Sequence, residues 1–449
     1  MTDTICAIST AIGVGGIAII RVSGKDSISI VNTIFKGKDL SKVNSHTINY
    51  GHIIYGEKLI DEVLVSVMKA PHTYTAEDVV EINIHGGIAT TNKVLEILLS
   101  NGCRLAEPGE FTKRAFLNGR IDLIEAEAVS DLINAETESA RNLSINQLSG
   151  KLSDIIRSIR KTLLEIEANI EVNIDYPEYE DIEEVDHSKI SSVLKDISKT
   201  VEKMIEESKT GKIIKSGINV ALIGLPNVGK SSLLNAFLEE DRAIVTDIPG
   251  TTRDTVEGKM RLNGIVLNFI DTAGIRQTDN KVEQIGVEKS LAAIEDADLV
   301  IFVHSVDQEF TEEEKQILKR LRNKKYIIFI NKDDLGDNKA IDLNEEVIYG
   351  NTVTKTGLDQ LKAKIIEMFS LSQIEKKDYT YIANARQLAL IKKVKDSIDS
   401  AIRASNEKLP IDLIEIDLTN ARNYLGDILG ERYKDELLDE LFSKFCLGK

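Results

Sequence analysis

The segment 224–231 reads Gly-Leu-Pro-Asn-Val-Gly-Lys-Ser and fits the phosphate-binding pattern G-x-x-x-x-G-K-S. A strand-like run, 218–223, precedes it and an apolar helical run, 232–238, follows it, which is the order that the pattern requires. In such a loop the glycines turn backbone N–H groups toward the phosphates, Lys230 reaches the β and γ oxygens, and the Ser231 hydroxyl binds Mg²⁺. The segment therefore predicts a nucleoside triphosphate site.

Two later motifs indicate the class of nucleotide. Asp271-Thr272-Ala273-Gly274 follows a second strand-like run, where Asp271 can hold Mg²⁺ through water and the Gly274 N–H can meet the γ-phosphate. Asn331-Lys332-Asp333-Asp334 follows a third and fits N-K-x-D. The Asp334 carboxylate can accept hydrogen bonds from both N1–H and the exocyclic amine of guanine, and adenine presents neither donor. The predicted base is therefore guanine.

Two other guanine-nucleotide elements are less regular. Residues 250–254, Gly-Thr-Thr-Arg-Asp, lie where the first switch loop belongs, about twenty residues after the phosphate loop, and Thr251 can bind Mg²⁺ when the γ-phosphate is present. Residues 354–357, Thr-Lys-Thr-Gly, resemble the S-A-K-T-G loop, but Val353 stands where Ser is usual. Base contacts in this second loop are therefore less regular than those of Asp334.

The hydrolysis apparatus departs from the Ras pattern, because Ile275 stands where a water-orienting Gln would be. Another group must position the water, and the candidates are Arg276, Gln277 and Glu283. The predicted Mg²⁺ ligands are Ser231, Thr251, Thr252 and Asp271. The predicted GTP contacts are Asn227, Val228, Gly229, Lys230, Ser231, Ser232, Thr251, Asp271, Thr272, Ala273, Gly274, Asn331, Lys332 and Asp334.

Composition limits the class of protein. The 449 residues suggest about two to four domains, and 42% hydrophobic residues suffice for several cores. A net charge of −17 argues against a simple polybasic nucleic-acid binder or a membrane-surface protein. The apolar run 5–20 is broken by glycines and lacks a basic start, so it resembles neither a signal peptide nor a spanning helix. Cys6, Cys103 and Cys446 form no C-x-x-C pair, and we expect a cytoplasmic protein with no membrane partner.

The texture of the chain changes near residue 118. Up to that point short β-rich runs alternate with Gly, Pro and Asn, which predicts a compact α/β or β domain. From Leu148 to Ile170 apolar residues step by threes and fours, as in a long amphipathic helix. The acidic run 165–186, with Pro177 inside it, is interpreted as a solvated loop between two helices.

The fold class that follows is α/β plus α. Strand-length apolar runs alternate with helical runs over 216–372, which predicts a doubly wound parallel sheet, and helical texture returns over 373–449, notably 385–404 and 413–445. The economical arrangement is a helical domain, 119–215 and 373–449, split around an inserted domain. Gly13-x-Gly15-x-x-Ala18 formally fits a dinucleotide fingerprint, but a strand-like run follows it, so we expect a turn between two strands there.

The chain as a whole resembles the tRNA uridine-modification GTPases, the MnmE or TrmE family, over essentially its full length. The most specific part is the tail 445–449, Phe-Cys-Leu-Gly-Lys, which is close to the family's terminal F-C-I-G-K. Further similar segments are 73–78 (Thr-Tyr-Thr-Ala-Glu-Asp), 81–87 ending in His-Gly-Gly, 108–112 (Pro-Gly-Glu-Phe-Thr) and 114–118 (Arg-Ala-Phe-Leu-Asn).

This resemblance implies an N-terminal α/β folate-binding and dimerisation domain (1–118), a discontinuous helical domain and an inserted P-loop G domain. It implies a homodimer whose G domains pair when GTP is bound and hydrolyse it with help from K⁺. With a flavin-dependent partner protein, in a hetero-oligomer, such enzymes add a carboxymethylaminomethyl or aminomethyl group to C5 of the wobble uridine of certain tRNAs. The one-carbon unit comes from a reduced folate, 5,10-methylene- or 5-formyl-tetrahydrofolate.

The resemblance also assigns roles to single positions. Glu283 matches the acid that orients the hydrolytic water, and a K⁺ ion can neutralise charge between the β and γ phosphates as an arginine finger does. Cys446 matches a thiol whose addition to C6 of uracil would activate C5, or else a structural thiol. The matched K⁺ positions are Asn227, Thr246, Ile248 and Thr251, and the matched folate contacts are Arg21, Glu81, Arg120 and Lys449.

Two other functions stay open on the sequence. The G domain also fits a GTP-switched module for ribosome assembly or RNA binding, because related G domains carry Asn after Pro in the phosphate loop. Such proteins usually append an RNA-binding domain, and no KH-type G-x-x-G pattern follows the G domain here. The remaining alternative is a folate-dependent enzyme in which GTP is only regulatory.

Overall fold

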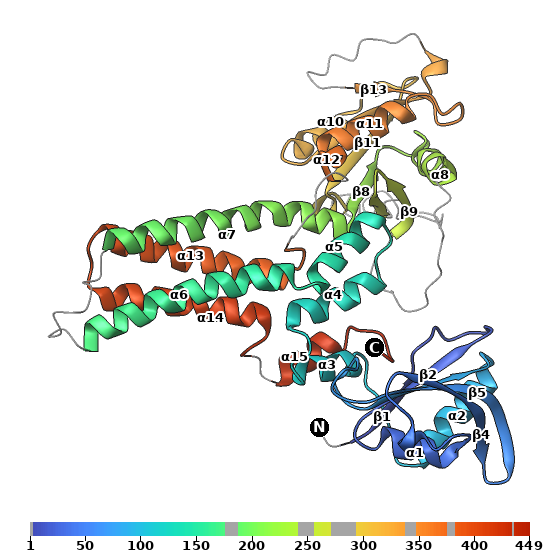
Figure 1. The fold of residues 1–449 in the computed structure, drawn as a ribbon. Coiled ribbons are helices and arrows are strands. Elements are labelled where there is room, and N and C mark those ends of the chain that lie inside the picture. The colour runs from blue at the N-terminus through green and yellow to red at the C-terminus, as the bar shows by residue number, and fades with distance from the viewer. Residues whose placement is uncertain are drawn as a thin grey trace. The chain divides into compact units, whose positions relative to one another are not determined.

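The computed structural model describes residues 3–175, 187–240, 256–270, 293–336, 347–374, 382–432 and 435–449 (Figure 1). The chain divides into two compact units, each with its own sheet. The first unit comprises 1–133, 147–201 and 389–449, and the second comprises 134–146 and 202–388. The chain therefore leaves the first unit twice, at 134–146 and at 202–388, and returns to it each time.

A seven-stranded sheet with the order β3-β4-β5-β6-β2-β1-β7 lies in the first unit. Its neighbouring strands are antiparallel except β1 and β7, which are parallel. Helices α1 (Ser27–Ile34) and α2 (Ile88–Ser100) contribute Val31, Val94 and Leu98 to the core beside the sheet. The strands are β1 (Ile5–Ile8), β2 (Ala18–Ser23), β3 (Phe35–Lys36), β4 (Thr47–Tyr55), β5 (Lys58–Met68), β6 (Val79–Ile84) and β7 (Arg104–Leu105).

The segment between β1 and β2 connects two antiparallel neighbours, so the turn expected at Gly13 and Gly15 is confirmed. No helix opens beneath it, as a dinucleotide fingerprint would require, because β2 begins at Ala18. Three shorter helices follow, which are α3 (Glu110–Leu117), α4 (Leu123–Ile133) and α5 (Glu138–Leu148), and most of α5 belongs to the second unit.

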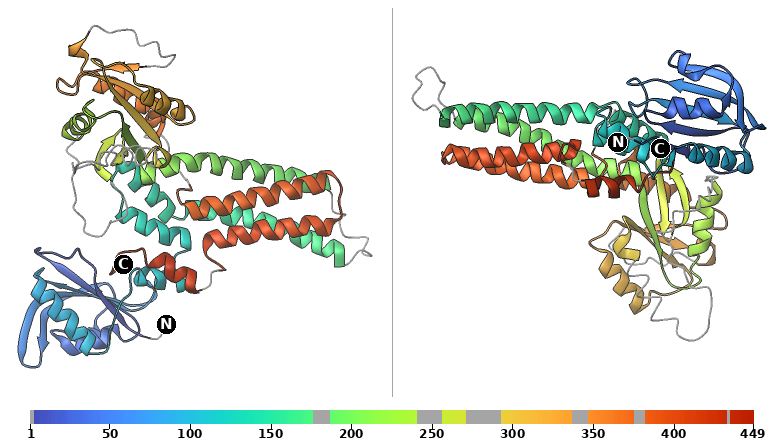
Figure 2. Two further views of the ribbon diagram at one scale, coloured as in Figure 1. Left: turned by 180° about the vertical axis from the view of Figure 1, so that it is seen from behind. Right: turned by 90° about the horizontal axis from the view of Figure 1, so that it is seen from below.

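Four long helices lie side by side: α6 (Lys151–Asp175), α7 (His187–Ser216), α13 (Ala385–Asn406) and α14 (Ile411–Leu429) (Figure 2). Leu152, Ile156 and Leu163 form the buried stripe of α6, as its sequence period predicts. Helix α14 packs on α6, and Ser198 of α7 donates to Asp399 of α13 over 2.9 Å. Helices from both sides of the second unit's sequence therefore pack together. In the described part of the chain, no helix is both long and apolar enough to cross a bilayer.

One expectation for the helices was wrong in detail. The acidic run does not begin as a loop, because α6 continues to Asp175 with Ile170 still buried and Glu167 accepting a 2.6 Å hydrogen bond from Arg422 Nε. Residues 176–186 lie outside the described part. The helical texture predicted over 413–445 is divided between two helices, since α14 ends at Leu429 before Gly430, whose φ of +92° suits glycine, and α15 (Asp435–Phe442) is separate.

The second unit contains a six-stranded sheet with the order β13-β12-β11-β8-β10-β9, within the residues described. All neighbouring pairs are parallel except β9 and β10, so the sheet is mixed. Strand β11 is buried along its whole length, as in a sheet covered on both faces. The strands are β8 (Ile218–Ile223), β9 (Val256–Leu262), β10 (Ile265–Ile270), β11 (Leu299–Ser305), β12 (Tyr326–Asn331) and β13 (Val347–Tyr349), and the helices are α8 (Lys230–Glu240), α10 (Glu312–Leu321), α11 (Leu358–Met368) and α12 (Leu371–Ile374).

Residues 134–146 group with the second unit, although the sequence placed them in the helical segment 119–215. Ala140 and Leu143 of α5 enter the same apolar core as Val220 and Phe269. The predicted division into the segments 1–118, 119–215, 216–372 and 373–449 therefore stays a proposal.

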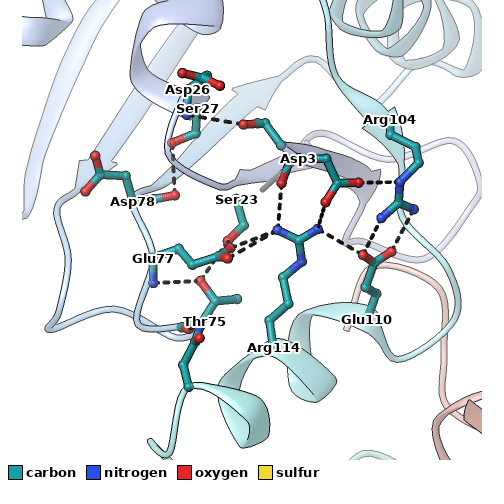
Figure 3. Close-up of polar contacts among 12 residues, drawn as sticks. Asp3, Ser23, Asp26, Ser27, Thr75, Glu77, Asp78, Arg104, Glu110 and Arg114 are labelled. Carbon is teal, nitrogen blue, oxygen red and sulfur yellow. Dashed lines mark hydrogen bonds and ion pairs between the residues drawn. The ribbon is translucent and has the colours of Figure 1, made fainter. Parts of the chain in front are cut away.

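The guanidinium of Arg114, on α3, is buried in a network of ions in the first unit (Figure 3). It is 1% exposed and donates to the backbone and carboxylate of Asp3, to Glu77 and to Glu110 over 2.9 to 3.3 Å. Arg104 donates to Glu110 as well, over 2.5 Å, and to Asp3 over 2.6 Å. Ser23 of β2 donates to Glu77, so the network joins the N-terminus, β2, α3 and the loop 73–78.

Replacing Arg114 by Met should lower the free energy of opening β2 and β6 by about 1.5–3 kcal/mol at neutral pH, because Glu77, Glu110 and Asp3 would each lose a hydrogen bond from a charged donor, while Arg104 still neutralises Glu110. Hydrogen exchange of the β2 and β6 amides measures this free energy locally. The exposed Arg141, changed to Met, is the matched control. Equal protection in the Arg114→Met protein and its parent would contradict the role of the network.

The same network makes stability depend on pH. Burial raises the pKa of Glu110, but hydrogen bonds from Arg104, the Glu107 N–H and Arg114 outweigh it, and the pKa is lowered. The hydrogen bond from Arg104 similarly lowers the pKa of Asp3. Carboxyl groups with lowered pKa values stabilise the fold above their ordinary titration range, and this stability is lost as the pH falls through the folded-state values. The difference between parent and Arg114→Met should therefore shrink in acid.

Candidate functional site

The phosphate-binding loop, 224–229, connects β8 to α8 in the strand, loop and helix order that its sequence predicts. Gly224 and Gly229 have φ values of +155° and +103°. A Cβ on Gly224 would lie 2.1 Å from the Val303 carbonyl oxygen, and one on Gly229 would lie 2.0 Å from Asn331 Nδ2. Both positions thus require glycine for conformation and for space. The first N–H groups of α8 are available to an anion there.

Lys230 is the first residue of α8, and its ammonium lies against the loop. Its Nζ donates to the carbonyl oxygens of Gly224 and Leu225, each over 2.8 Å. Burial lowers the pKa of Lys230. Ser231 and Ser232 follow at the exposed start of the helix, where hydroxyls can reach a metal ion or phosphate. The arrangement has the donors that a triphosphate and its Mg²⁺ need.

Asn227 lies at the exposed tip of this loop with a φ of +64°. Asn tolerates the left-handed region better than other residues that carry a side chain, so this position accepts Asn or Gly. Val228, the next residue, is buried, which anchors the loop. The exposed amide of Asn227 is free to take part in binding an ion above the loop.

The side chain of Asn331 joins the phosphate loop to a second loop, 351–356. Its Nδ2 donates to the Val228 carbonyl oxygen over 2.9 Å, and its Oδ1 accepts from the Thr352 N–H over 3.1 Å. Asn331 is the last residue of β12 and is 1% exposed. The first residue of the N-K-x-D motif therefore links the two loops, and Lys332 and Asp334 follow it in the chain.

Lys332 and Asp334 are placed at the surface beside that second loop. Lys332 has a left-handed backbone, with φ +60°, and its ammonium lies 3.9 Å from the Asp307 carboxylate. The exposed carboxylate of Asp334 accepts a 2.5 Å hydrogen bond from Asn351 Nδ2. The structure thus brings the phosphate loop, Asn331, Lys332 and Asp334 to one end of the parallel strands, where ligands bind in such sheets.

Several predicted nucleotide and metal residues lie outside the described part of the chain. The residues concerned are Thr246, Ile248, Thr251, Thr252, Asp271, Thr272, Ala273, Gly274, Ile275, Arg276, Gln277 and Glu283. Their roles in Mg²⁺ binding, K⁺ binding and water orientation stay predictions.

A second group of polar residues lies in the first unit. Arg21 of β2 and Glu81 of β6 are directly opposite each other in the antiparallel register. Arg21 Nε and Nη2 lie 2.9 and 2.8 Å from Glu81 Oε1, and both side chains are partly exposed. The two residues were predicted as contacts of the same ligand, and the sheet register places them together.

Tyr74 connects this ion pair to Arg120. The guanidinium carbons of Arg21 and Arg120 lie 5.4 and 5.1 Å from the centre of the Tyr74 ring, and Arg120 Nη1 donates to the Tyr74 carbonyl oxygen over 3.0 Å. The Tyr74 hydroxyl is 2.8 Å from Thr112 Oγ1 on α3. The result is an aromatic ring flanked by cations, with a carboxylate alongside, which suits a flat heterocycle that carries an anionic tail.

In the sequence, Tyr74 stands only within the similar segment 73–78, and its spacing assigns it no role at a site. Phe111, whose ring centre lies 5.6 Å from the Arg21 guanidinium carbon, was likewise not singled out. An aromatic residue within a polar segment is too common to mark a site by itself. The Arg–Tyr–Arg arrangement arises only when β2, the loop 73–78 and the residues after α3 come together.

The C-terminal tail returns to this part of the first unit. Gly109 N–H donates to the Cys446 carbonyl oxygen over 3.3 Å, and Ser9 Oγ donates to the Gly448 carbonyl oxygen over 3.0 Å. A Cβ on Gly448 would lie 2.2 Å from the Ile8 carbonyl oxygen, so the tail lies directly against the end of β1. Cys446 itself is exposed and lies beyond the end of α15, rather than within a helical stretch. Lys449 is partly exposed in the same segment.

Known proteins match the chain along its length. The model of the GTP-binding protein TrmE N-terminus matches residues 4–120, and that of the MnmE helical domain matches residues 123–446. A tRNA modification GTPase MnmE of Ligilactobacillus salivarius (strain UCC118) is 50% identical over 456 residues, which cover 100% of this chain and 98% of that protein. The MnmE of Bacillus cytotoxicus is also 50% identical, over 100% of this chain and 99% of its own.

Some solved structures match a part of the chain. The G domain of the T. maritima FeoB iron transporter is 28% identical, with a TM-score of 0.25, and covers 34% of this chain and 98% of its own. The match is confined to a third of the chain, so the full-length comparisons identify the family.

Proposed function

This chain belongs to the MnmE family of tRNA modification GTPases, and on that premise we propose how its two units divide the work. The second unit hydrolyses GTP with Mg²⁺ and K⁺. The first unit binds a reduced folate, 5,10-methylene- or 5-formyl-tetrahydrofolate, and presents Cys446. With a flavin-dependent partner protein in a hetero-oligomer, the homodimer adds a carboxymethylaminomethyl or aminomethyl group to C5 of the wobble uridine of certain tRNAs in the cytoplasm.

The observation that carries this proposal is the group formed by Arg21, Glu81, Tyr74 and Arg120, in the unit to which the C-terminal tail returns. A module that used GTP only to switch RNA binding would have no need of an aromatic ring close to two cations, far along the chain from its G motifs. The full-length similarity to MnmE proteins also covers every part outside the G motifs, which disfavours the ribosome-assembly alternative.

In the nucleotide site, the residues of this chain bind and orient rather than react. The loop 224–229 and the start of α8 direct N–H groups at phosphate oxygens, Lys230 adds a positive charge, and Asp334 reads the base. A monovalent cation held by Asn227, together with Thr246, Ile248 and Thr251, supplies the positive charge that an arginine finger supplies elsewhere. Glu283 orients the attacking water in place of the absent Gln.

Replacing K⁺ by Na⁺ should slow GTP hydrolysis at least about tenfold, a barrier increase of ~1.4 kcal/mol, and leave nucleotide affinity nearly unchanged. Asn227→Gly should be slow in both salts, because glycine keeps the left-handed backbone and removes only the amide. Asn263→Gly, at another left-handed Asn with φ +51°, is the matched control. Glu283→Ala should lower kcat far more than affinity. Steady-state rates of GTP hydrolysis, measured in K⁺ and in Na⁺ for the parent and both variants, test these expectations. Equal rates of the parent in the two salts would contradict the K⁺ proposal.

The folate proposal rests on chemical fit. A pterin ring offers a flat face and donor groups, for which Tyr74 and the Glu81 carboxylate are suitable partners. The glutamyl carboxylates of folate match Arg120 and Lys449, and Arg21 holds the Glu81 carboxylate in place through the ion pair. When bound, the folate supplies the one-carbon unit.

Arg120→Ala should weaken binding of 5-formyl-tetrahydrofolate to the full-length protein about tenfold, since a hydrogen bond to a charged group contributes about 1.5–3 kcal/mol. Glu81→Gln should weaken it as well, because one acceptor becomes a donor. Isothermal titration calorimetry measures both, with the exposed Arg141→Ala as control. Wild-type affinity in the two site variants would remove the folate from this group of residues.

Cys446 is proposed as the group that acts on the uridine, in line with its exposure at the tail. A thiolate that adds to C6 of the ring makes C5 nucleophilic, and departure of the thiolate after substitution and loss of the C5 proton restores the double bond. The backbone of Cys446, not its thiol, makes the contact with Gly109, so a change of side chain leaves that contact in place.

Cys446→Ser should abolish tRNA modification in a reaction reconstituted with the flavoprotein, because a serine hydroxyl is scarcely ionised at neutral pH. GTP hydrolysis should persist, since the phosphate loop belongs to the other unit. Nucleoside analysis of the tRNA gives the readout, and Leu447→Ala, at an exposed neighbour, is the control. Modification at the parental rate would assign Cys446 a packing role.

A further inference from the structure

Asn351 is a buried amide at the start of the loop 351–356. The residue is only 5% exposed, and both the nitrogen and the oxygen of its side-chain amide make hydrogen bonds. Nδ2 donates to Asp334 Oδ1 over 2.5 Å, and Oδ1 accepts from the N–H groups of Val353 and Thr354 over 2.8 and 3.3 Å. One side chain therefore shapes the turn of its own loop and contacts the residue assigned to the base.

Val353 shows why the hydrogen bond to Asp334 must come from another residue of the loop. It stands where Ser is usual in such loops, and its side chain is 85% exposed, so it contributes no polar group toward Asp334. Asn351, two residues earlier, reaches the carboxylate instead. The loop is closed behind it by the Asn351 N–H, which donates to the Thr356 carbonyl oxygen over 3.1 Å.

We infer that Asn351 is a positioning residue for guanine recognition, which orients the Asp334 carboxylate so that both of its oxygens face the donors of the base. The inference rests on the proposed role of Asp334. A carboxylate that accepts from two parallel donors must lie in one plane with them. Asp334 is exposed, so without the bond from Asn351 its side chain would be free to rotate. The bond from Asn351 removes that freedom before the base arrives, which is preorganisation.

The same loop also fixes the phosphate side of the site. Thr352, next to Asn351, donates its N–H to Asn331, and Asn331 in turn holds the phosphate loop through Val228. Adjacent residues of one loop thus set the positions of the base-reading carboxylate and of the phosphate loop. A substitution of Asn351 should weaken recognition of the base more than binding of the phosphates, because its side chain contacts Asp334 and not the phosphate loop.

Asn351→Asp separates orientation from loop structure. The aspartate keeps an oxygen for the N–H groups of Val353 and Thr354 but turns an acceptor, in place of a donor, toward Asp334. GTP affinity should fall about tenfold or more, and the preference for GTP over ITP should shrink, because inosine lacks the exocyclic amine that Asp334 reads. Fluorescent-nucleotide competition with GTP and ITP measures both. Asn268→Asp is the control, since the Asn268 amide donates to Ser216 and Asn219 far from the base.

A double-mutant cycle with Asp334→Ala decides the outcome. If Asn351 acts through Asp334, Asn351→Asp should have no further effect on the GTP-to-ITP ratio once Asp334 is Ala. The inference would be overturned if Asn351→Asp lowered the GTP-to-ITP ratio equally with Asp or with Ala at position 334, or if Asn351→Asp alone kept the parental GTP affinity. Either result would leave the role of Asp334 intact. An unchanged ratio in Asp334→Ala alone would overturn the base assignment itself, and this inference with it. Asn351→Ala should reproduce the direction of the effect.

Discussion

The amide of Asn331 is buried between two loops and bonds to the backbone of each. Because a buried amide costs free energy when either half is unpaired, the phosphate loop and the loop 351–356 hold their positions only together. Gly229 follows from this constraint, since any side chain at that position would occupy the space of the amide. The nucleotide site is therefore organised around one side chain that holds both loops, and its own contact with GTP stays a prediction.

The first unit uses ions for a comparable purpose. Arg114 lies among Asp3, Glu77 and Glu110, and the loop that carries Tyr74 is fixed at Glu77. A buried ion network adds little net stability over apolar packing, because desolvation of the charges offsets their attraction. We interpret the network as a device that selects one shape for loop 73–78, so that Tyr74 meets both Arg21 and Arg120.

The chain's architecture separates the two chemistries. The second unit is formed by stretches that interrupt the first in sequence, and the C-terminal tail returns to the end of β1. Cys446 and Lys449 are consequently close to the N-terminal residues in space although they are at the opposite end of the chain. This return explains why the tail motif and the N-terminal segments can serve one site.

The amino-acid sequence by itself determined the local elements and the motifs. The strand, loop and helix around Lys230, the stripe of α6 and the β-rich texture before residue 118 follow from periodicity and turn residues, which act over a few positions. Tertiary structure alone decided what lies beside what. The ring of Tyr74 between two arginines, and Asn351 in place of the missing Ser, depend on hydrogen bonds and ring contacts between distant residues, and no spacing along the chain specifies these because they arise only when separate elements pack.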